Sequence, residues 1–332
     1  MTVPLSVLDL APIASGGTAR ESFEASVALA QAAERNGYRR VWYAEHHNMA
    51  SIASSATSVL IAHVAAHTTS IRLGAGGVML PNHSPLVIAE QFGTLATLHP
   101  DRIDLGLGRA PGSDQTTARA MRRDAAASNQ FPEDVLELQA YLAGESRVPG
   151  VQAVPGAGTR VPLYILGSSL FGAQLAAALG LPYAFASHFA PAALEQAVAT
   201  YRREFRPSEQ LSEPYVLAAV NAVAADDAAE AQHQLTVRRR AWVRGMLSRG
   251  PAGTSFTDEQ VDGFLLTDQG RQLADMLRYT AVGTVDDVRT YLDDFAVHAD
   301  ADELIVAFQS MDTTDRLRSL ELTAQAAQGV GV

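Results

Sequence analysis

Residues 71–95 read IRLGAGGVMLPNHSPLVIAEQFGTL, and this stretch contains one complete strand-to-helix unit. Its first ten residues are mostly apolar and fit a strand, although two adjacent glycines interrupt them. Ser84 followed by Pro85 predicts a helix start, because a hydroxyl can cap the helix and proline costs nothing at the first helical position. The apolar residues that then recur at helical spacing are Ile88, Phe92 and Leu95.

The same alternation of a short apolar run and an Ala-rich helical segment recurs along the whole chain. The runs that we predict as strands are residues 5–10, 40–46, 71–80, 102–108, 162–167, 183–188, 215–223 and 303–308. Eight such units in 332 residues predict a (β/α)₈ TIM barrel, with a doubly wound sheet as the second choice. We expect one domain over residues 1–332.

Two stretches exceed what a strand-helix unit needs, and we predict both as insertions in the barrel. Residues 144–161, before the fifth strand, are rich in Gly and Pro. Residues 245–283 separate the seventh strand from the eighth, and their first part, GMLSRGPAGTSFTDEQ, fits either a mobile segment near the barrel mouth or a plain surface loop.

The composition excludes several kinds of chemistry. All 25 basic residues are arginine, so no lysine is present for a Schiff base or a phosphate-binding loop, and no cysteine is present for a thiolate. A net charge of −11 without a long basic run argues against nucleic acid as a partner. No apolar run approaches the length of a membrane span, and no signal peptide is recognisable, so we expect a soluble, cytoplasmic protein.

The sequence AEHHNM at residues 44–49 stands at the end of the second predicted strand, where a barrel places its active site. Alternation along the strand directs His46 to the barrel interior and Glu45 to the other side. Three interpretations of His46 remain open: a metal ligand, an acid-base or hydrogen-bonding group in a pocket, and a structural histidine. The metal is the weakest of them, because further ligands at suitable spacing are missing, and we predict no metal site.

A second group of polar residues follows the fourth and fifth strands. Arg109 ends LGLGR and suits a phosphate or carboxylate, or else a salt bridge to the next loop. Ser168 and Ser169 precede a helix, so they form either an anion site or an ordinary serine cap. Because these strands are neighbours in a barrel, Arg109 and the serine turn could hold one phosphate between them.

The segments GYRRVWYAEHHNM, IRLGAGGVMLPNHSPLVIAEQFGTL, RIDLGLGRAPG and LYILGSSLFGAQLAAALGLPYAFASHF closely resemble bacterial luciferase-like flavin monooxygenases of the single-chain group. The resemblance covers nearly the whole chain. It implies a barrel that binds reduced FMN (FMNH₂) from a separate flavin reductase. Oxygen would add at the flavin C4a, and the peroxyflavin would oxygenate a small or medium organic substrate.

The resemblance also assigns roles to individual residues. His46 would lie beside the flavin, and a non-proline cis peptide between Gly76 and Gly77 would lie under its ring. The flavin phosphate would be bound by Arg109, Ser168, Ser169 and Gly172. The last two residues of the sixth predicted strand, Ser187 and His188, would face the substrate.

The resemblance leaves alternative functions open and adds an expected oligomeric state. A deazaflavin cofactor with hydride transfer and a flavin-binding protein without turnover are the alternative functions. Relatives commonly pair through the helices after strands two and three, so residues 54–69, SSATSVLIAHVAAHTT, are the expected homodimer surface. An Arg-only, Ala-rich composition is typical of a high-GC bacterial genome, for which natural-product tailoring is one expected role. No residue identifies the substrate, and light emission does not follow from the sequence.

Overall fold

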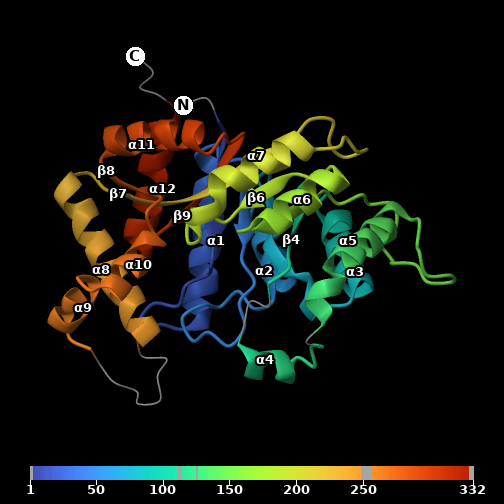
Figure 1. The fold of residues 1–332 in the computed structure, drawn as a ribbon, viewed down its shortest axis with the longest axis horizontal. Coiled ribbons are helices and arrows are strands. Elements are labelled where there is room, and N and C mark those ends of the chain that lie inside the picture. The colour runs from blue at the N-terminus through green and yellow to red at the C-terminus, as the bar shows by residue number, and fades with distance from the viewer. Residues whose placement is uncertain (1–2, 111–113, 125, 248–255, 329–332) are drawn as a thin grey trace.

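A closed parallel barrel surrounded by helices forms the centre of the molecule (Figure 1). The computed structural model describes residues 3–110, 114–124, 126–247 and 256–328. Its strands are β1 Leu5–Asp9, β2 Arg40–Tyr43, β3 Arg72–Met79, β4 Ile103–Gly108, β5 Leu163–Gly167, β6 Tyr183–Phe185, β7 Val216–Ala224, β8 Thr280–Gly283 and β9 Glu303–Phe308.

Eight of these strands form the barrel, in the order β1 to β7 and then β9. Each pairs in parallel with the next, β9 pairs with β1, and pairing of β6 with β7 completes the circle. The predicted (β/α)₈ architecture is therefore confirmed, and the doubly wound sheet is excluded. Parallel strands bring all their carboxyl ends to one mouth, so the loops after β1, β2, β3, β4, β5, β6, β7 and β9 meet there.

The helices cover the outside of the barrel and connect successive strands. They are α1 Ala19–Arg35, α2 Thr57–Ala65, α3 Pro85–Leu98, α4 Gln115–Ala120, α5 Ala127–Ala143, α6 Leu170–Leu179, α7 Leu194–Glu204, α8 Ala228–Leu247, α9 Asp258–Leu265, α10 Asp268–Asp275, α11 Val285–His298 and α12 Thr313–Gln328, with short 3₁₀ turns η1 Leu80–Asn82 and η2 Pro191–Ala193. Helix α3 begins at Pro85 as predicted, although the Ser84 side chain makes no capping hydrogen bond.

Three details of the predicted strands are wrong. Strands β2 and β6 end at Tyr43 and Phe185, so His46 and His188 lie in the loops beyond them. A ninth strand, β8, pairs with the far end of β7 outside the barrel. Its four residues are too few to produce a recognisable alternation, and they lie inside the stretch that we predicted as an insertion.

The two predicted insertions differ in structure. Residues 144–162 connect α5 to β5 without any helix or strand. The second insertion is built largely of helix, because α8 runs to Leu247 and α9 and α10 follow, grouped on one side of the barrel (Figure 1). Residues 248–255, the centre of the predicted mobile segment, lie outside the described residues. Within the described part of the chain, no helix is long and apolar enough to cross a membrane.

The bottom of the barrel interior is filled by a charged cluster. Arg40, at the start of β2, donates from Nη1 to Asp104 Oδ2 at 2.8 Å, and its Nε lies 2.9 Å from Glu303 Oε1. All three side chains are at most 1% exposed. Tyr164 accepts a hydrogen bond from Arg40 at 2.6 Å. Above this layer lies an apolar one that includes Trp42 and Ala44, which confirms the inward side that alternation predicted for β2.

Candidate active site at the barrel mouth

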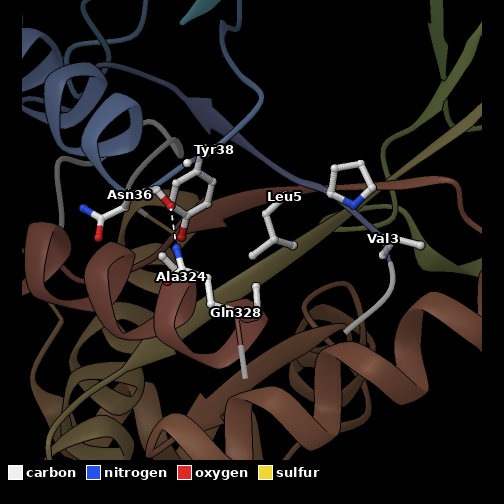
Figure 2. A pocket seen from close by; sticks show the side chains of 9 residues that line it. Val3, Leu5, Asn36, Tyr38, Ala324 and Gln328 are labelled. Carbon is white, nitrogen blue, oxygen red and sulfur yellow. Dashed lines mark hydrogen bonds between the residues drawn. The ribbon is translucent and has the colours of Figure 1, made fainter. Parts of the chain in front are cut away.

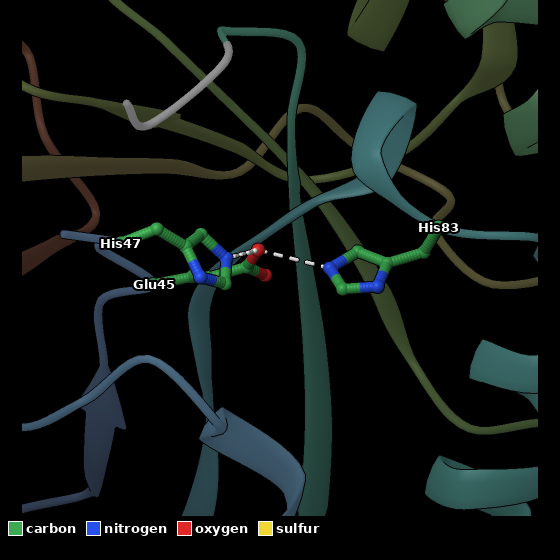
Figure 3. A group of neighbouring side chains, drawn as sticks. All are labelled: Glu45, His47 and His83. Atoms are coloured by element: carbon green, nitrogen blue, oxygen red, sulfur yellow. Dashed lines mark hydrogen bonds and ion pairs between the residues drawn. The ribbon is translucent and has the colours of Figure 1, made fainter. Parts of the chain in front are cut away.

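Glu45, two residues past β2, organises the first part of the mouth (Figure 3). Its Oε1 accepts hydrogen bonds from His47 Nε2 at 2.7 Å and from His83 Nε2 at 2.9 Å, and its Oε2 accepts one from the Met79 backbone N–H at 3.0 Å. The carboxylate is 1% exposed. It therefore ties the loop after β2 to the end of β3 and to the turn that follows.

The chemistry of this cluster includes metal-ligand types. The ligand atoms of Glu45, His47 and His83 lie within 4.8 Å of one another. In the structure, however, both carboxylate oxygens accept hydrogen bonds, so the arrangement is that of a hydrogen-bonded cluster. Burial raises the pKa of Glu45. The hydrogen bond and charge of His83, the hydrogen bond from His47 and that from the Met79 N–H together lower it by more, so the net pKa lies below the usual range.

Replacement of Glu45 should destabilise the mouth in a pH-dependent way. We expect Glu45→Gln to lower the free energy of unfolding at pH 7 by about 2–3 kcal/mol, because charge-assisted hydrogen bonds to a buried carboxylate are lost. A depressed folded pKa contributes stability above the unfolded pKa, and this stability is lost as the pH falls through the folded value. The difference from wild type should thus shrink at acid pH.

Denaturant unfolding at several pH values measures this effect. The exposed Glu133, which forms a surface ion pair with Arg147, provides the control Glu133→Gln, expected to change the free energy of unfolding by less than about 1 kcal/mol. A Glu45→Gln loss that is the same at every pH would show that the negative charge is not what stabilises the mouth.

His46 and His188 lie close enough for their charges to interact. Burial and, to a smaller extent, the charge of the nearby His46 lower the pKa of His188 to about 4. His188 is therefore neutral at pH 7. Its Nδ1 is buried without a hydrogen-bond partner among the residues that the structure describes. The structure thus brings together two histidines that the sequence placed on separate strands.

The glycine pair of β3 lies beside this group. The peptide bond between Gly76 and Gly77 is cis, as the family resemblance implied. A Cβ on Gly76 would lie 2.9 Å from Trp42 Cβ, and one on Gly77 would lie 2.7 Å from the Gly106 carbonyl oxygen. Both positions therefore need glycine for reasons of space. Gly76 is partly accessible to solvent, so its backbone is not covered by a side chain of its own.

Arg109 and the turn before α6 come together as predicted. The Arg109 guanidinium lies over the Phe171 ring, 3.9 Å from its centroid, so the end of β4 contacts the first turn of α6. Among the described residues Arg109 has no ion pair, which argues against the salt-bridge alternative. Ser169 is the N-cap of α6, yet its hydroxyl caps nothing, and Ser168 is exposed.

Gly172 and Ser187 have local structural reasons for their identities. Gly172 is buried in the first turn of α6, where a Cβ would lie 3.3 Å from the Tyr183 ring. Ser187 is fully buried, and its hydroxyl donates to the Ala219 carbonyl oxygen on β7 at 2.5 Å. The Ser187 hydroxyl is engaged by the barrel wall, so its role on the substrate side stays a prediction.

Two hollows open on the surface, at opposite ends of the barrel. One of about 330 Å³ lies at the amino ends of the strands, beside Leu5, Tyr38 and Gln328 (Figure 2). Barrel enzymes do not place their chemistry at that end. The other, of about 290 Å³, lies at the mouth and is lined by Ser168, by Phe189 and the residues after it, and by Asp275 and Met276 from the insertion.

Sequence reasoning missed the central role of Glu45 and its partner His83. The alternation that placed His46 inward placed Glu45 on the other side of the strand, so Glu45 was not among the predicted site residues. His83 belongs to a different loop, and a single sequence contains no sign of which loop it meets. The one signal in the sequence was a carboxylate at the end of a buried strand, because a buried acid needs hydrogen-bond partners.

Comparison with known proteins agrees with this architecture. The model of the luciferase-like monooxygenase family matches residues 3–312. A luciferase-like monooxygenase of Escherichia coli (strain K12) is 50% identical over 323 residues, which cover 97% of this chain and 96% of the relative. The crystal structure of apo-MsnO8 superposes with a TM-score of 0.87 at 35% identity, covering 98% of both chains.

A more distant structure shares the fold alone. It is the oxygenating constituent of 3,6-diketocamphane monooxygenase from the CAM plasmid of Pseudomonas putida, a type II Baeyer-Villiger monooxygenase solved in complex with FMN. Its TM-score is 0.72 at 16% identity, covering 98% of this chain and 97% of that one. The family match over most of the chain and the identity to the E. coli protein establish the relationship: this chain belongs to the luciferase-like monooxygenase family.

Proposed function

We propose that the protein is a two-component, FMN-dependent monooxygenase that receives reduced FMN from a separate reductase and oxygenates an organic substrate. The observation that carries the cofactor assignment is the contact between Arg109 and the first turn of α6. Membership of the family and the FMN complex of a structural neighbour support it.

The residues after β4 and β5 fit a phosphate. The Arg109 guanidinium has no carboxylate partner among the described residues, and the start of α6 is not capped by the Ser169 side chain. The first N–H groups of a helix carry a partial positive charge and favour an anion. Arg109, Ser168, Ser169 and the backbone at Gly172 would hold the FMN phosphate between them.

The flavin ring would lie in the mouth over the glycine pair of β3. A Cβ at Gly76 would clash with the Trp42 and Leu8 side chains, so glycine is needed there, and the flavin ring would pack against this backbone. When bound, the reduced flavin supplies the electrons that activate oxygen. His46 would hold or move a proton at an imidazole nitrogen near the reactive edge of the ring, and neutral His188 would donate or accept one hydrogen bond.

Removal of the Arg109 charge tests the phosphate assignment. We expect Arg109→Gln to weaken FMN binding by about 10–100-fold, because a charge-assisted contact with a phosphate is lost. Riboflavin, which lacks the phosphate, should bind wild type and variant equally. Fluorescence titration with both flavins measures this, and Arg147→Gln, at an exposed arginine, is the matched control.

Equal loss of FMN and riboflavin affinity in Arg109→Gln would refute the phosphate role.

A deazaflavin competitor added to the same titration examines the alternative cofactor: preference of wild type for deazaflavin over FMN would favour hydride transfer. Slower reoxidation by oxygen of bound than of free reduced FMN is expected for a monooxygenase, and equal rates would contradict the proposed function.

We also propose that two copies pair through α2 and α3, which contact each other in the structure. Val59 on α2 is 69% exposed, and Leu98 on α3 is 65% exposed, so two helices present apolar side chains to solvent. Light scattering should give the mass of a dimer, and Val59→Glu should shift it toward a monomer. Val297→Glu, at a valine on α11 that is 83% exposed, should leave the mass unchanged.

A further inference from the structure

Helix α8 carries arginines of two kinds. Arg240 contacts Asp258 at 2.9 Å and Asp262 at 2.5 Å, and Arg244 also pairs with Asp258, so these cations are neutralised by α9. Arg238 has no ion pair with any described residue. All Asp and Glu residues of the chain lie within the described ranges, so no side-chain carboxylate of this protomer neutralises Arg238.

Arg238 is nevertheless fixed in place and directed toward the barrel mouth. Its Nε donates to Gln309 Oε1 at 2.8 Å, and Gln309 lies just past the end of β9. Burial lowers the pKa of Arg238, whereas hydrogen bonding and charge from Asp262 raise the pKa of Arg240. Arg238 is therefore a desolvated cation without compensation, which is unfavourable unless an anion binds beside it.

A chain of hydrogen bonds connects Arg238 to His188. Gln309 Nε2 donates to Asn221 Oδ1 at 2.8 Å, and Asn221 Nδ2 donates to the His188 carbonyl oxygen at 2.7 Å. Arginine can only donate, so it makes the Gln309 oxygen the acceptor and fixes the direction of both amides. Arg238 and the His188 loop are thus held in one geometry at the carboxyl ends of β6, β7 and β9.

This side of the mouth is opposite to the proposed phosphate site. In barrel order, β7 and β9 are the seventh and eighth strands, and β4, which carries Arg109, is the fourth. A flavin phosphate at Arg109 would leave the Arg238 side for another molecule. His188 Nδ1, buried without a partner among the described residues, is a second polar atom in this region available to such a molecule.

We propose that Arg238 binds a carboxylate of the organic substrate at the β7–β9 side of the mouth, beside His188. The proposal rests on the proposed function and identifies the class of its substrate as organic acids. The guanidinium would form a charge-assisted contact with the carboxylate through its terminal nitrogens, which have no hydrogen-bond partner among the described residues. Arg239, also without an ion pair there, adds to the positive potential.

The test compares acids with their uncharged counterparts. A panel of N-acyl amino acids and medium-chain fatty acids, each paired with its primary amide, is titrated calorimetrically into wild type, Arg238→Gln and the exposed-arginine control Arg20→Gln, with and without FMN. We expect wild type and Arg20→Gln to bind at least one acid about tenfold or more tightly than its amide. Arg238→Gln should lose that preference, and Arg238→Lys should retain part of it.

Three results would overturn the proposal. In the first, wild type prefers no acid to its amide, and in the second, the preference survives in Arg238→Gln. The third is weaker binding of FMN relative to riboflavin in Arg238→Gln, since the guanidinium would then bind the flavin phosphate. Thermal unfolding of Arg238→Gln at or above the wild-type temperature confirms that the variant folds. A wild type that binds acids but not FMN would contradict the proposed cofactor and leave this inference standing.

Discussion

Arg40→Met should lower the free energy of unfolding by about 3–5 kcal/mol, because it removes the buried cation that lies between two buried carboxylates. Arg40 lies inside the barrel between Asp104 and Glu303, and both carboxylates are 0% exposed. Arg72 also contacts Asp104, at 2.5 Å, and Tyr215 donates to Glu303 at 2.7 Å, but neither replaces a full buried cation between the two acids. Methionine fills a similar volume, so the lost stability should come mainly from the missing charge and less from changed packing.

The pH dependence of Arg40→Met separates charge from packing. A buried carboxylate without its cation has a folded pKa raised above the unfolded value, so it contributes stability at low pH that is lost as the pH rises. The variant should therefore be closer to wild type at pH 5 than at pH 8 in denaturant unfolding. Arg147→Gln, at an exposed ion pair, should cost less than about 1 kcal/mol. A mild, pH-independent loss in Arg40→Met would contradict the charged-cluster interpretation.

His46→Ala should reduce substrate oxygenation by about 10²–10⁴-fold, the usual contribution of a positioned acid-base group. This expected loss of activity rests on the proposed function and on the position of His46 at the mouth, where its charge interacts with His188. FMN affinity should change only a few-fold, since the phosphate is held by Arg109 and the α6 turn. Oxygen consumption should continue, with its product shifted from oxygenated substrate to hydrogen peroxide.

Oxygen uptake and peroxide yield, measured with a reductase and candidate organic acids, test this prediction. His233→Ala removes an exposed histidine on α8 and serves as the control. Unchanged coupling of oxygen use to product in His46→Ala would show that His46 is structural. A different result would favour a flavin-binding protein without turnover: both wild type and variant bind FMN, but neither consumes oxygen faster than free flavin does.

The barrel could be predicted from the sequence because its signals are local. A strand shows a short apolar run, a helix shows its period and its start signal, and both are visible in residues 71–95 without knowledge of the rest. The place of Arg109 beside the turn before α6 followed from the same logic, since consecutive strands of a barrel are neighbours. The inward side of β2 followed from alternation.

The partners of charged residues could not be predicted in this way. Arg40, Asp104 and Glu303 each stand within or at the edge of an apolar run, which indicates an inward charge but not which charge it meets. They come together only because β9 returns to β1 and closes the barrel. Strand β8 escaped prediction for a related reason: four residues acquire their strand structure from pairing with β7.

By itself, the sequence determined the (β/α)₈ fold, the absence of lysine and cysteine chemistry, and which strand ends carry polar groups. Only the tertiary structure showed that Glu45 joins His47 to His83, and that Arg238 reaches His188 through two amides. Periodicity is fixed by neighbours a few residues apart, whereas charge neutralisation can depend on residues far apart in the sequence, such as Arg40 and Glu303, which are 263 positions apart. A charge left without a partner becomes visible only when every possible partner has been placed.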